Sequence, residues 1–185
     1  MKKFLPGLYL FVIVFTASLA IQVGTSQISA SVKQKEKSKD EVLEEKLNKI
    51  ETQTISGKKI NLGNIKSKIT IVNFWASWCI PCMEEMPSLV SLKQKFKSEE
   101  LTIVSFNTDE NDQLKNIDKT LKRFKITNEF EVVADKETKI ADSLKISAIP
   151  VTYILKNNKI VKSYNGPVDF NSVEFIDGLK KLIQN

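Results

Sequence analysis

The fold is decided by the segment Trp78-Cys79-Ile80-Pro81-Cys82, which holds both cysteines of this 185-residue chain. An apolar, partly β-branched run at residues 69–75 precedes the segment and predicts a buried strand. A helix is predicted to follow, over residues 81–97. Two cysteines three positions apart at a strand-to-helix junction are typical of a dithiol redox site.

Helix geometry explains why this spacing suits redox chemistry. Residues i and i+3 lie on one face of a helix, so the sulfurs of Cys79 and Cys82 can approach disulfide-bonding distance. The helix N-terminus offers unpaired N–H groups and a partial positive charge, and both favour the thiolate that attacks in thiol–disulfide exchange. A purely structural disulfide is the alternative, but so short a loop removes little freedom from the unfolded chain.

Composition excludes several other kinds of site. The chain has no histidine, which excludes Ser-His-Asp and Cys-His catalysis and every histidine-ligated metal or haem site. Two cysteines cannot complete a four-cysteine zinc site. We therefore expect no cofactor and no metal. The formal net charge is +6, but there is no dense basic tract, so nucleic acid is not an expected partner.

The N-terminus is typical of an exported protein. Lys2 and Lys3 precede an uncharged run at residues 8–21, as in a secretory signal. Residues 4–23 are also long enough to span a bilayer, so residues 1–30 fit either a cleaved signal peptide or a retained membrane anchor. In both cases the leading positive charges predict an extracytoplasmic location, in a periplasm or at the outer face of the plasma membrane.

Residues 31–51 are charged and contain neither glycine nor proline, and we interpret them as a partly helical spacer. Four apolar residues fall at helical spacing there, which leaves a docking helix or a short coiled coil as the alternative: Val42, Leu43, Leu47 and Ile50. The main domain is predicted to cover residues 52–185.

This domain has the predicted element order β-β-β-α-β-α-β-α-β-β-α, which indicates an α/β fold. It opens with a hairpin, in which Ile55 and residues 60–62 flank the turn at Ser56-Gly57-Lys58. The later elements are predicted as strand 69–75, helix 81–97, strand 101–106, helix 112–125, strand 131–133, helix 139–144, strands 151–155 and 160–164, and helix 173–183. The middle strands should be parallel and buried, and the last two antiparallel.

The segment at residues 72–87, VNFWASWCIPCMEEMP, resembles the active-site segment of the TlpA/ResA-like branch of the thioredoxin superfamily. A second motif at residues 146–153, ISAIPVTY, supports the resemblance, which covers about residues 53–185. It implies a thioredoxin-like fold in which helices flank a central mixed sheet. An N-terminal hairpin and a central insertion around residues 112–130 also fit this branch.

The resemblance implies roles for several residues. Cys79 is similar to the exposed attacking thiol of this family, and Cys82 to the inner, resolving thiol. Glu85 matches the acidic residue that this branch places three positions after the second cysteine. A carboxylate there should raise the thiol pKa values and can relay a proton. Asn73 occupies a position where typical thioredoxins carry a buried Asp, which leaves Glu85 as the only acid assigned to proton handling.

The expected substrate-binding residues lie on both sides of the dithiol. Pro150 is similar to the cis-proline that faces the dithiol in this family, and the backbone of Ile149 is expected to pair with substrate like an added strand. Trp78 is expected to shield the site, and Pro81 removes one N–H from the first helical turn. Trp75 is interpreted as a core residue.

A cluster of acidic residues follows the strand predicted at residues 101–106, and we interpret it as a solvated turn with a helix cap. Its members are Asp109, Glu110 and Asp112.

The expected function is exchange of electrons with protein disulfides through Cys79 and Cys82, outside the cytoplasm. The resemblance favours a reductant, for example in cytochrome c maturation, with apocytochrome c as a candidate substrate and a membrane electron donor of the CcdA/DsbD type. A disulfide oxidant or isomerase, and a non-catalytic binding module tethered to the membrane, are the alternatives. A peroxiredoxin-like peroxidase is disfavoured, because Cys79 lacks the P-x-x-x-[ST]-x-x-C setting of a peroxidatic cysteine.

Overall fold

The computed structural model describes residues 37–127 and 129–184. The predicted signal or anchor at residues 1–30 lies outside this range. Within it, no helix combines the length and the apolar character needed to cross a bilayer.

The centre of the domain is a five-stranded mixed sheet with the strand order β5-β4-β3-β6-β7. Strands β3, β4 and β5 run parallel and β7 is antiparallel to β6, as the sequence predicts, and β6 is also antiparallel to β3. The strands are β3 (Ile69–Trp75), β4 (Leu101–Asn107), β5 (Glu131–Ala134), β6 (Val151–Lys156) and β7 (Lys159–Asn165). This strand order and these strand directions confirm the predicted thioredoxin-like α/β fold.

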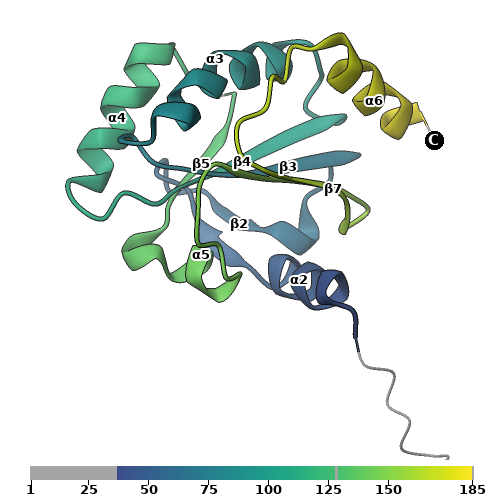
Figure 1. The fold of residues 1–185 in the computed structure, drawn as a ribbon, viewed down its shortest axis with the longest axis horizontal. Helices are drawn as coiled ribbons and strands as arrows, with labels where there is room; N and C mark the ends of the chain where they lie inside the picture. The colour runs from purple at the N-terminus through teal and green to yellow at the C-terminus, as the bar shows by residue number, and fades with distance from the viewer. Residues whose placement is uncertain (1–36, 128, 185) are drawn as a thin grey trace, which may run out of the picture. The chain divides into compact units, whose positions relative to one another are not determined.

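Helices cover both faces of the sheet (Figure 1). One face carries α3 (Ile80–Gln94), α4 (Gln113–Phe124) and α6 (Val173–Gln184). The other carries α2 (Lys39–Asn48), α5 (Lys139–Ser143) and a hairpin of β1 (Glu51–Gln53) and β2 (Lys59–Asn61). Two short 3₁₀ helices lie at Leu62–Asn64 and Lys136–Thr138.

Strand β3 divides the core into two layers. All seven of its residues are buried. Ile69, Ile71 and Trp75 pack in the cluster beneath α3, α4 and α6, whereas Val72 and Phe74 pack in the cluster on the opposite face. Successive side chains of a strand point to opposite faces, so a strand covered on both sides needs an almost continuous apolar sequence. This requirement explains the apolar character of the ITIVNFW sequence. The alternation of side chains places Asn73 on the face of the sheet that α3 covers.

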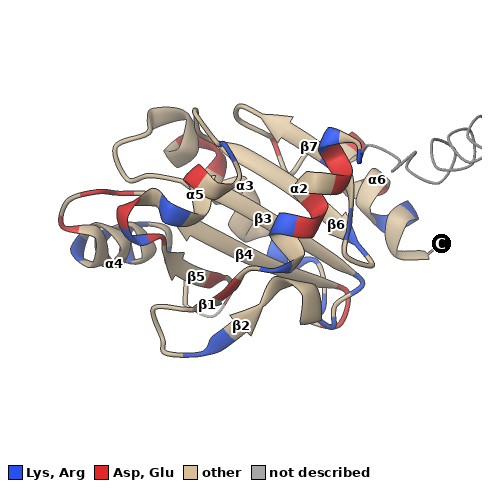
Figure 2. Ribbon diagram, turned by 90° about the horizontal axis from the view of Figure 1, so that it is seen from below, with Lys and Arg blue, Asp and Glu red and all other residues tan. Residues whose placement is uncertain are grey.

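Helix α2 packs against the domain. Acidic and basic residues share its outer surface (Figure 2), but Leu47 is fully buried and joins Ile50 and Leu62 in the cluster on that face of the sheet. The compact unit that the structure describes begins at Lys39. Residues 39–51, which we interpreted as part of a spacer, therefore pack with the domain, and this favours the docking-helix alternative.

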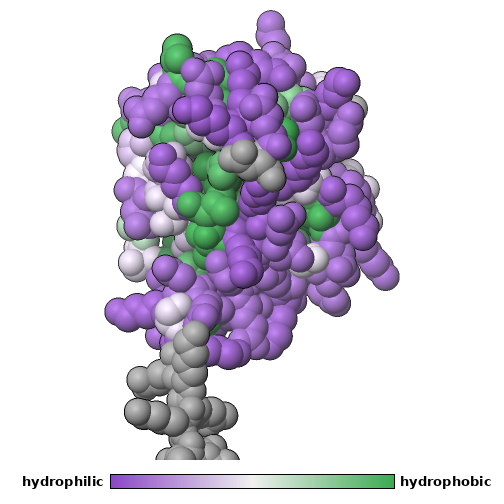
Figure 3. Space-filling view, turned by 90° about the vertical axis from the view of Figure 1, so that its right-hand side faces the viewer, coloured by the Kyte–Doolittle hydropathy of each residue, from purple (hydrophilic) through white to green (hydrophobic). Residues whose placement is uncertain are grey.

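Strand β7 forms one edge of the sheet and is largely exposed. Figure 3 shows the side of the molecule at the end of α6, where a narrow apolar strip lies among hydrophilic residues. Lys159 and Lys162 are exposed on the strand, and Val161 is 41% exposed between them. Charged side chains along an edge strand hinder its pairing with another chain, so this edge is protected against sheet extension.

Candidate active site

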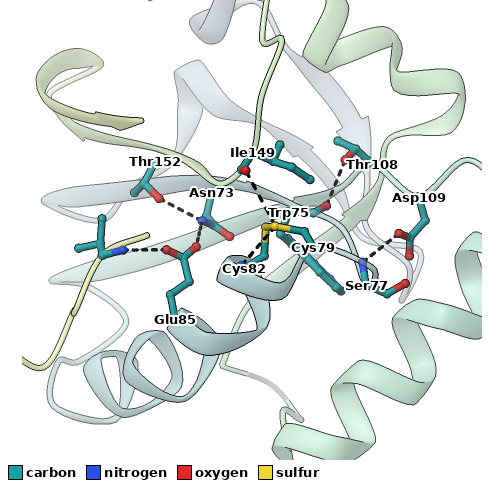
Figure 4. The surroundings of a disulfide bond; sticks show 11 residues. Asn73, Trp75, Ser77, Cys79, Cys82, Glu85, Thr108, Asp109, Ile149 and Thr152 are labelled. Carbon is teal, nitrogen blue, oxygen red and sulfur yellow. Dashed lines mark hydrogen bonds between the residues drawn. A yellow bond between two sulfur atoms is a disulfide. The ribbon is translucent and has the colours of Figure 1, made fainter. Parts of the chain in front are cut away.

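The two cysteines form a disulfide at the junction between β3 and α3 (Figure 4). Cys79 is the N-cap residue of α3, and the Cys82 N–H donates to the Cys79 sulfur over 3.2 Å. Pro81 lies in the first helical turn, where its missing N–H costs no helical hydrogen bond. The helix N-terminus therefore directs a backbone donor at the first sulfur, as the spacing predicts.

Both cysteines are buried in the disulfide form. Cys82 is fully buried, and Cys79 is 5% exposed. The expectation of an exposed attacking sulfur therefore needs correction for the disulfide form. The loop opposite explains the low exposure, because the Ile149 carbonyl oxygen lies 3.9 Å from the Cys79 sulfur (Figure 4).

The loop that faces the disulfide has the expected backbone form. The Ile149–Pro150 peptide bond is cis. Pro150 is buried and Ile149 is half-buried. The Pro150 carbonyl accepts a hydrogen bond from the N–H of Gly166 over 2.8 Å, which ties the loop to the end of β7. The loop is thus fixed at the sheet edge, and it contacts the disulfide through the Ile149 carbonyl.

The two tryptophans beside the site have different environments. Trp75 is buried in the core, as expected. Trp78, next to Cys79 in the chain, is 69% exposed, so its side chain lies on the surface of the protein. Ile80 is also exposed, on the other side of Cys79 in the sequence. The entrance to the disulfide is therefore bordered by apolar surface.

Glu85 lies one turn after Cys82 on α3 and is only 4% exposed. One carboxylate oxygen accepts the side-chain N–H of Asn73, and the other accepts the backbone N–H of Val168, each over 3.0 Å. Burial raises the pKa of Glu85 to about 7, although both hydrogen bonds oppose the rise. A carboxyl group with this pKa can both accept and release a proton near neutral pH.

Asn73 fixes the position of Glu85. Its side-chain N–H₂ group donates to Glu85 and to the hydroxyl of Thr152, each over 3.0 Å (Figure 4). The central strands β3 and β6 thereby hold the carboxylate from the sheet side. This arrangement requires an amide donor at residue 73, where a carboxylate would repel Glu85.

Asp109 is buried and supports the site. The expectation that it lies in a solvated turn is wrong. One of its carboxylate oxygens accepts the N–H of Ser77 over 2.9 Å, and the other accepts the side-chain N–H of Asn107 over 3.2 Å. The neighbouring Thr108 donates its N–H to the Trp75 carbonyl over 2.9 Å. These contacts fix the segment between β3 and Cys79. Glu110 and Asp112 are exposed, and the Asp112 side chain forms no cap hydrogen bond.

The place of Asp109 in the sequence could have indicated that this residue lies near the site. It follows β4, which pairs in parallel with β3. The carboxyl ends of neighbouring parallel strands meet at one edge of a sheet, where functional loops gather. A polar residue just after β4 is therefore expected to lie near the loop after β3.

A third buried carboxylate, Asp135, fixes the start of α5. Its two oxygens accept the N–H groups of Ile140 and Ala141 over 2.8 and 2.9 Å. Burial raises the pKa of Asp135. Among the residues described, no group of three or more Cys, Asp or Glu side chains is arranged to hold a metal ion.

Similarity to known proteins agrees with the fold and the motifs. The AhpC/TSA family model matches residues 43–164. The thiol-disulfide oxidoreductase ResA of Bacillus cereus is 33% identical over 114 residues, which are 60% of this chain and 63% of that protein, less than two thirds of its length. ResA of Bacillus anthracis is 31% identical over 131 residues, 70% of this chain and 71% of the relative.

A solved structure supports the same assignment. StoA from Bacillus subtilis has 28% sequence identity and a TM-score of 0.57, over 72% of this chain and 94% of StoA. The chain therefore belongs to the AhpC/TSA family and, within it, to the ResA-like proteins with a thioredoxin-like fold.

Proposed function

We propose that the protein is an extracytoplasmic thiol–disulfide oxidoreductase that reduces disulfides in other exported proteins. One observation carries the proposal: the Cys79–Cys82 disulfide lies at the N-terminus of α3, and the loop with the cis Ile149–Pro150 bond faces its first sulfur. The relatives from Bacillus cereus and Bacillus anthracis, which are named thiol-disulfide oxidoreductases, support it.

The reaction begins from the reduced pair. The Cys79 thiolate attacks one sulfur of the substrate disulfide, whose S–S bond breaks, and the second substrate sulfur leaves as a thiolate. The N–H of Cys82 and the positive end of α3 stabilise the attacking thiolate. The product of this step is a mixed disulfide between Cys79 and the substrate.

The second step releases the substrate. The Cys82 thiolate attacks the Cys79 sulfur, the mixed disulfide breaks, and the Cys79–Cys82 bond forms. Two electrons have then passed to the substrate, which takes up two protons. We assign Glu85 the task of accepting the proton of Cys82, because it lies one turn along the same helix and has a pKa of about 7.

The proposed direction requires a supply of electrons. Compartments outside the cytoplasm are oxidising, so a reductant there must be reduced again after each turnover. We propose a membrane electron donor of the CcdA/DsbD type, and apocytochrome c among the substrates. The apolar N-terminal run at residues 8–21 supports an exported protein close to this donor.

A reduction potential measured against glutathione tests the direction. A reductant is expected to have a potential well below the DsbA value of about −120 mV, and a value near that figure would overturn the proposed direction. Reduction of insulin by the dithiol form tests the activity itself. Both measurements use the full-length protein.

Trapping with the Cys82→Ala variant tests the mechanism in cells. Without the resolving sulfur, the mixed disulfide between Cys79 and its substrate should persist and can be identified. Cys79→Ala, which keeps the inner sulfur, is the matched control and should trap nothing. Absence of any partner linked through Cys79 would contradict the exchange mechanism.

A further inference from the structure

We propose that a cavity beside Cys79 selects substrates that carry a lysine or arginine next to their reactive cysteine. The proposal rests on the proposed function and adds a substrate class to it. The cavity has a volume of about 370 Å³. Its walls come from four parts of the fold: Trp78, the β4–α4 loop, α5 with the 3₁₀ turn before it, and the segment before the cis-proline.

The cavity adjoins the reacting sulfur. Trp78 precedes Cys79 in the chain, and Ile149, which lines the cavity, has its carbonyl oxygen 3.9 Å from the Cys79 sulfur. Residues 146–148 continue the lining away from the disulfide. A substrate chain bonded to Cys79 and extended along this segment therefore places a side chain next to its cysteine into the cavity.

The cavity carries negative charge on two separate elements. Glu110 projects from the loop after β4, and Asp142 belongs to α5. One oxygen of Asp142 accepts the hydroxyl of Thr138 over 3.2 Å. The described lining contains no lysine or arginine, and neither carboxylate has a salt-bridge partner in the part of the chain that the structure describes. A cation placed here would meet two carboxylates and no competing positive charge.

Trp78 favours the same kind of side chain. Its indole is 69% exposed and lines the cavity together with the half-buried Ile146. The methylene stem of a lysine or arginine can lie along these apolar surfaces while its charged end reaches the carboxylates. A cation over an indole face is also attracted by the ring. An acidic side chain would gain none of these contacts and would be repelled.

The net charge of the whole protein opposes the expected preference for basic peptides, so this preference can be assigned to the cavity. The formal net charge is +6, so long-range attraction favours acidic peptides over basic ones. A preference for basic peptides must therefore arise locally, at the cavity. Raising the salt concentration should weaken this local preference, because both carboxylates are exposed.

The experiment isolates the first chemical step. Full-length Cys82→Ala protein, with Cys79 reduced, is mixed with synthetic peptides whose single cysteine is carried as a disulfide with thionitrobenzoate. Attack by Cys79 breaks that disulfide, joins the peptide to Cys79 and releases coloured thionitrobenzoate, whose absorbance gives the rate. The residue on each side of the peptide cysteine is varied in turn between lysine, methionine and glutamate.

We expect the lysine peptide to react about threefold to tenfold faster than the methionine peptide on one side of the cysteine, with the glutamate peptide slowest. Adding Glu110→Gln and Asp142→Asn should bring the three rates to within about twofold of one another. The control pair Asp118→Asn and Glu174→Gln makes the same charge change on α4 and α6 and should keep the preference.

The outcomes separate this inference from the proposed function. Equal rates for the three peptides, or a preference that survives the cavity substitutions, would overturn the inference and leave the proposed function intact. If no peptide releases thionitrobenzoate faster than it does with protein that lacks both cysteines, the proposed function fails and the inference fails with it.

Discussion

Replacing Glu85 with glutamine should remove a pH-dependent loss of stability. The carboxyl group has a pKa of about 7 in the folded protein, against an ordinary value of 4.5. The folded state therefore holds this proton more tightly than the unfolded chain does. The resulting stability is fully present below pH 4.5 and is lost as the pH rises through 7, because the buried carboxylate must then ionise.

The size of the effect follows from the pKa difference. A shift of about 2.5 pH units corresponds to about 3 kcal/mol in the free energy of unfolding. Glutamine has nearly the same shape and never ionises. The free energy of unfolding of Glu85→Gln, relative to the original protein, should therefore increase by up to about 3 kcal/mol between pH 4.5 and pH 8.

Urea denaturation followed by tryptophan fluorescence measures this difference at a series of pH values. The protein is kept oxidised, because disulfide-bonded cysteines do not titrate. Glu84→Gln, an exposed neighbour on α3, is the matched control. If the original protein and Glu85→Gln give parallel curves of unfolding free energy against pH, the carboxyl group does not titrate as the structure requires, and its assigned part in proton transfer loses its basis.

Three further substitutions test the supports of the fold, each by the free energy of unfolding in urea. Leu47→Ala should cost about 2–5 kcal/mol because it leaves a cavity beneath α2, whereas the exposed Val42→Ala should cost less than about 0.5 kcal/mol. Asp109→Ala should cost about 1–3 kcal/mol, since two buried donors lose their acceptor, and the exposed Glu110→Ala should change little. Asp135→Ala should cost about 1–2 kcal/mol through the loss of two contacts to α5. Equal effects within either matched pair would contradict the packing described.

The central strands and helices could be predicted because short stretches of sequence determine them. Strand 69–75 was predicted at its observed bounds, since an apolar run of this length has few other solutions. Helix 81–97 was predicted three residues too long at its end. It stops at Gln94, where the Lys95 N–H bonds back to Leu92, and the buried Phe96 turns into the core. Apolar residues that continue past a helix end therefore mislead a periodicity argument.

The first hairpin shows the same limit. The turn at residues 56–58 was predicted, but its first strand lies at Glu51–Gln53, before Ile55. The N–H of Ile55 instead donates to the carbonyl of Val132, far away in the sequence. A contact of this kind depends on the assembled fold, so no local pattern could have predicted it.

In the candidate site too, some features could be predicted from local sequence and others could not. The cysteine pair, the cis-proline and the acid after the second cysteine follow from motifs. Burial of Asp109 and the low exposure of Cys79 do not, because both arise where β4 and the loop before Pro150 meet the start of α3. Residue type alone predicts that a run of acidic residues is solvated. The register of two parallel strands instead buries one of these residues, Asp109.

The restricted access to Cys79 has a consequence for the shape of its partners. Thiol–disulfide exchange proceeds by in-line displacement, so an incoming sulfur must approach opposite the bond that breaks. Cys79 is 5% exposed in the disulfide form and its sulfur lies 3.9 Å from the Ile149 carbonyl, and we infer from this that an extended stretch of polypeptide makes that approach more readily than a folded surface. On this inference, chain segments that have not yet folded, or that stay unfolded, are the substrates that the geometry favours.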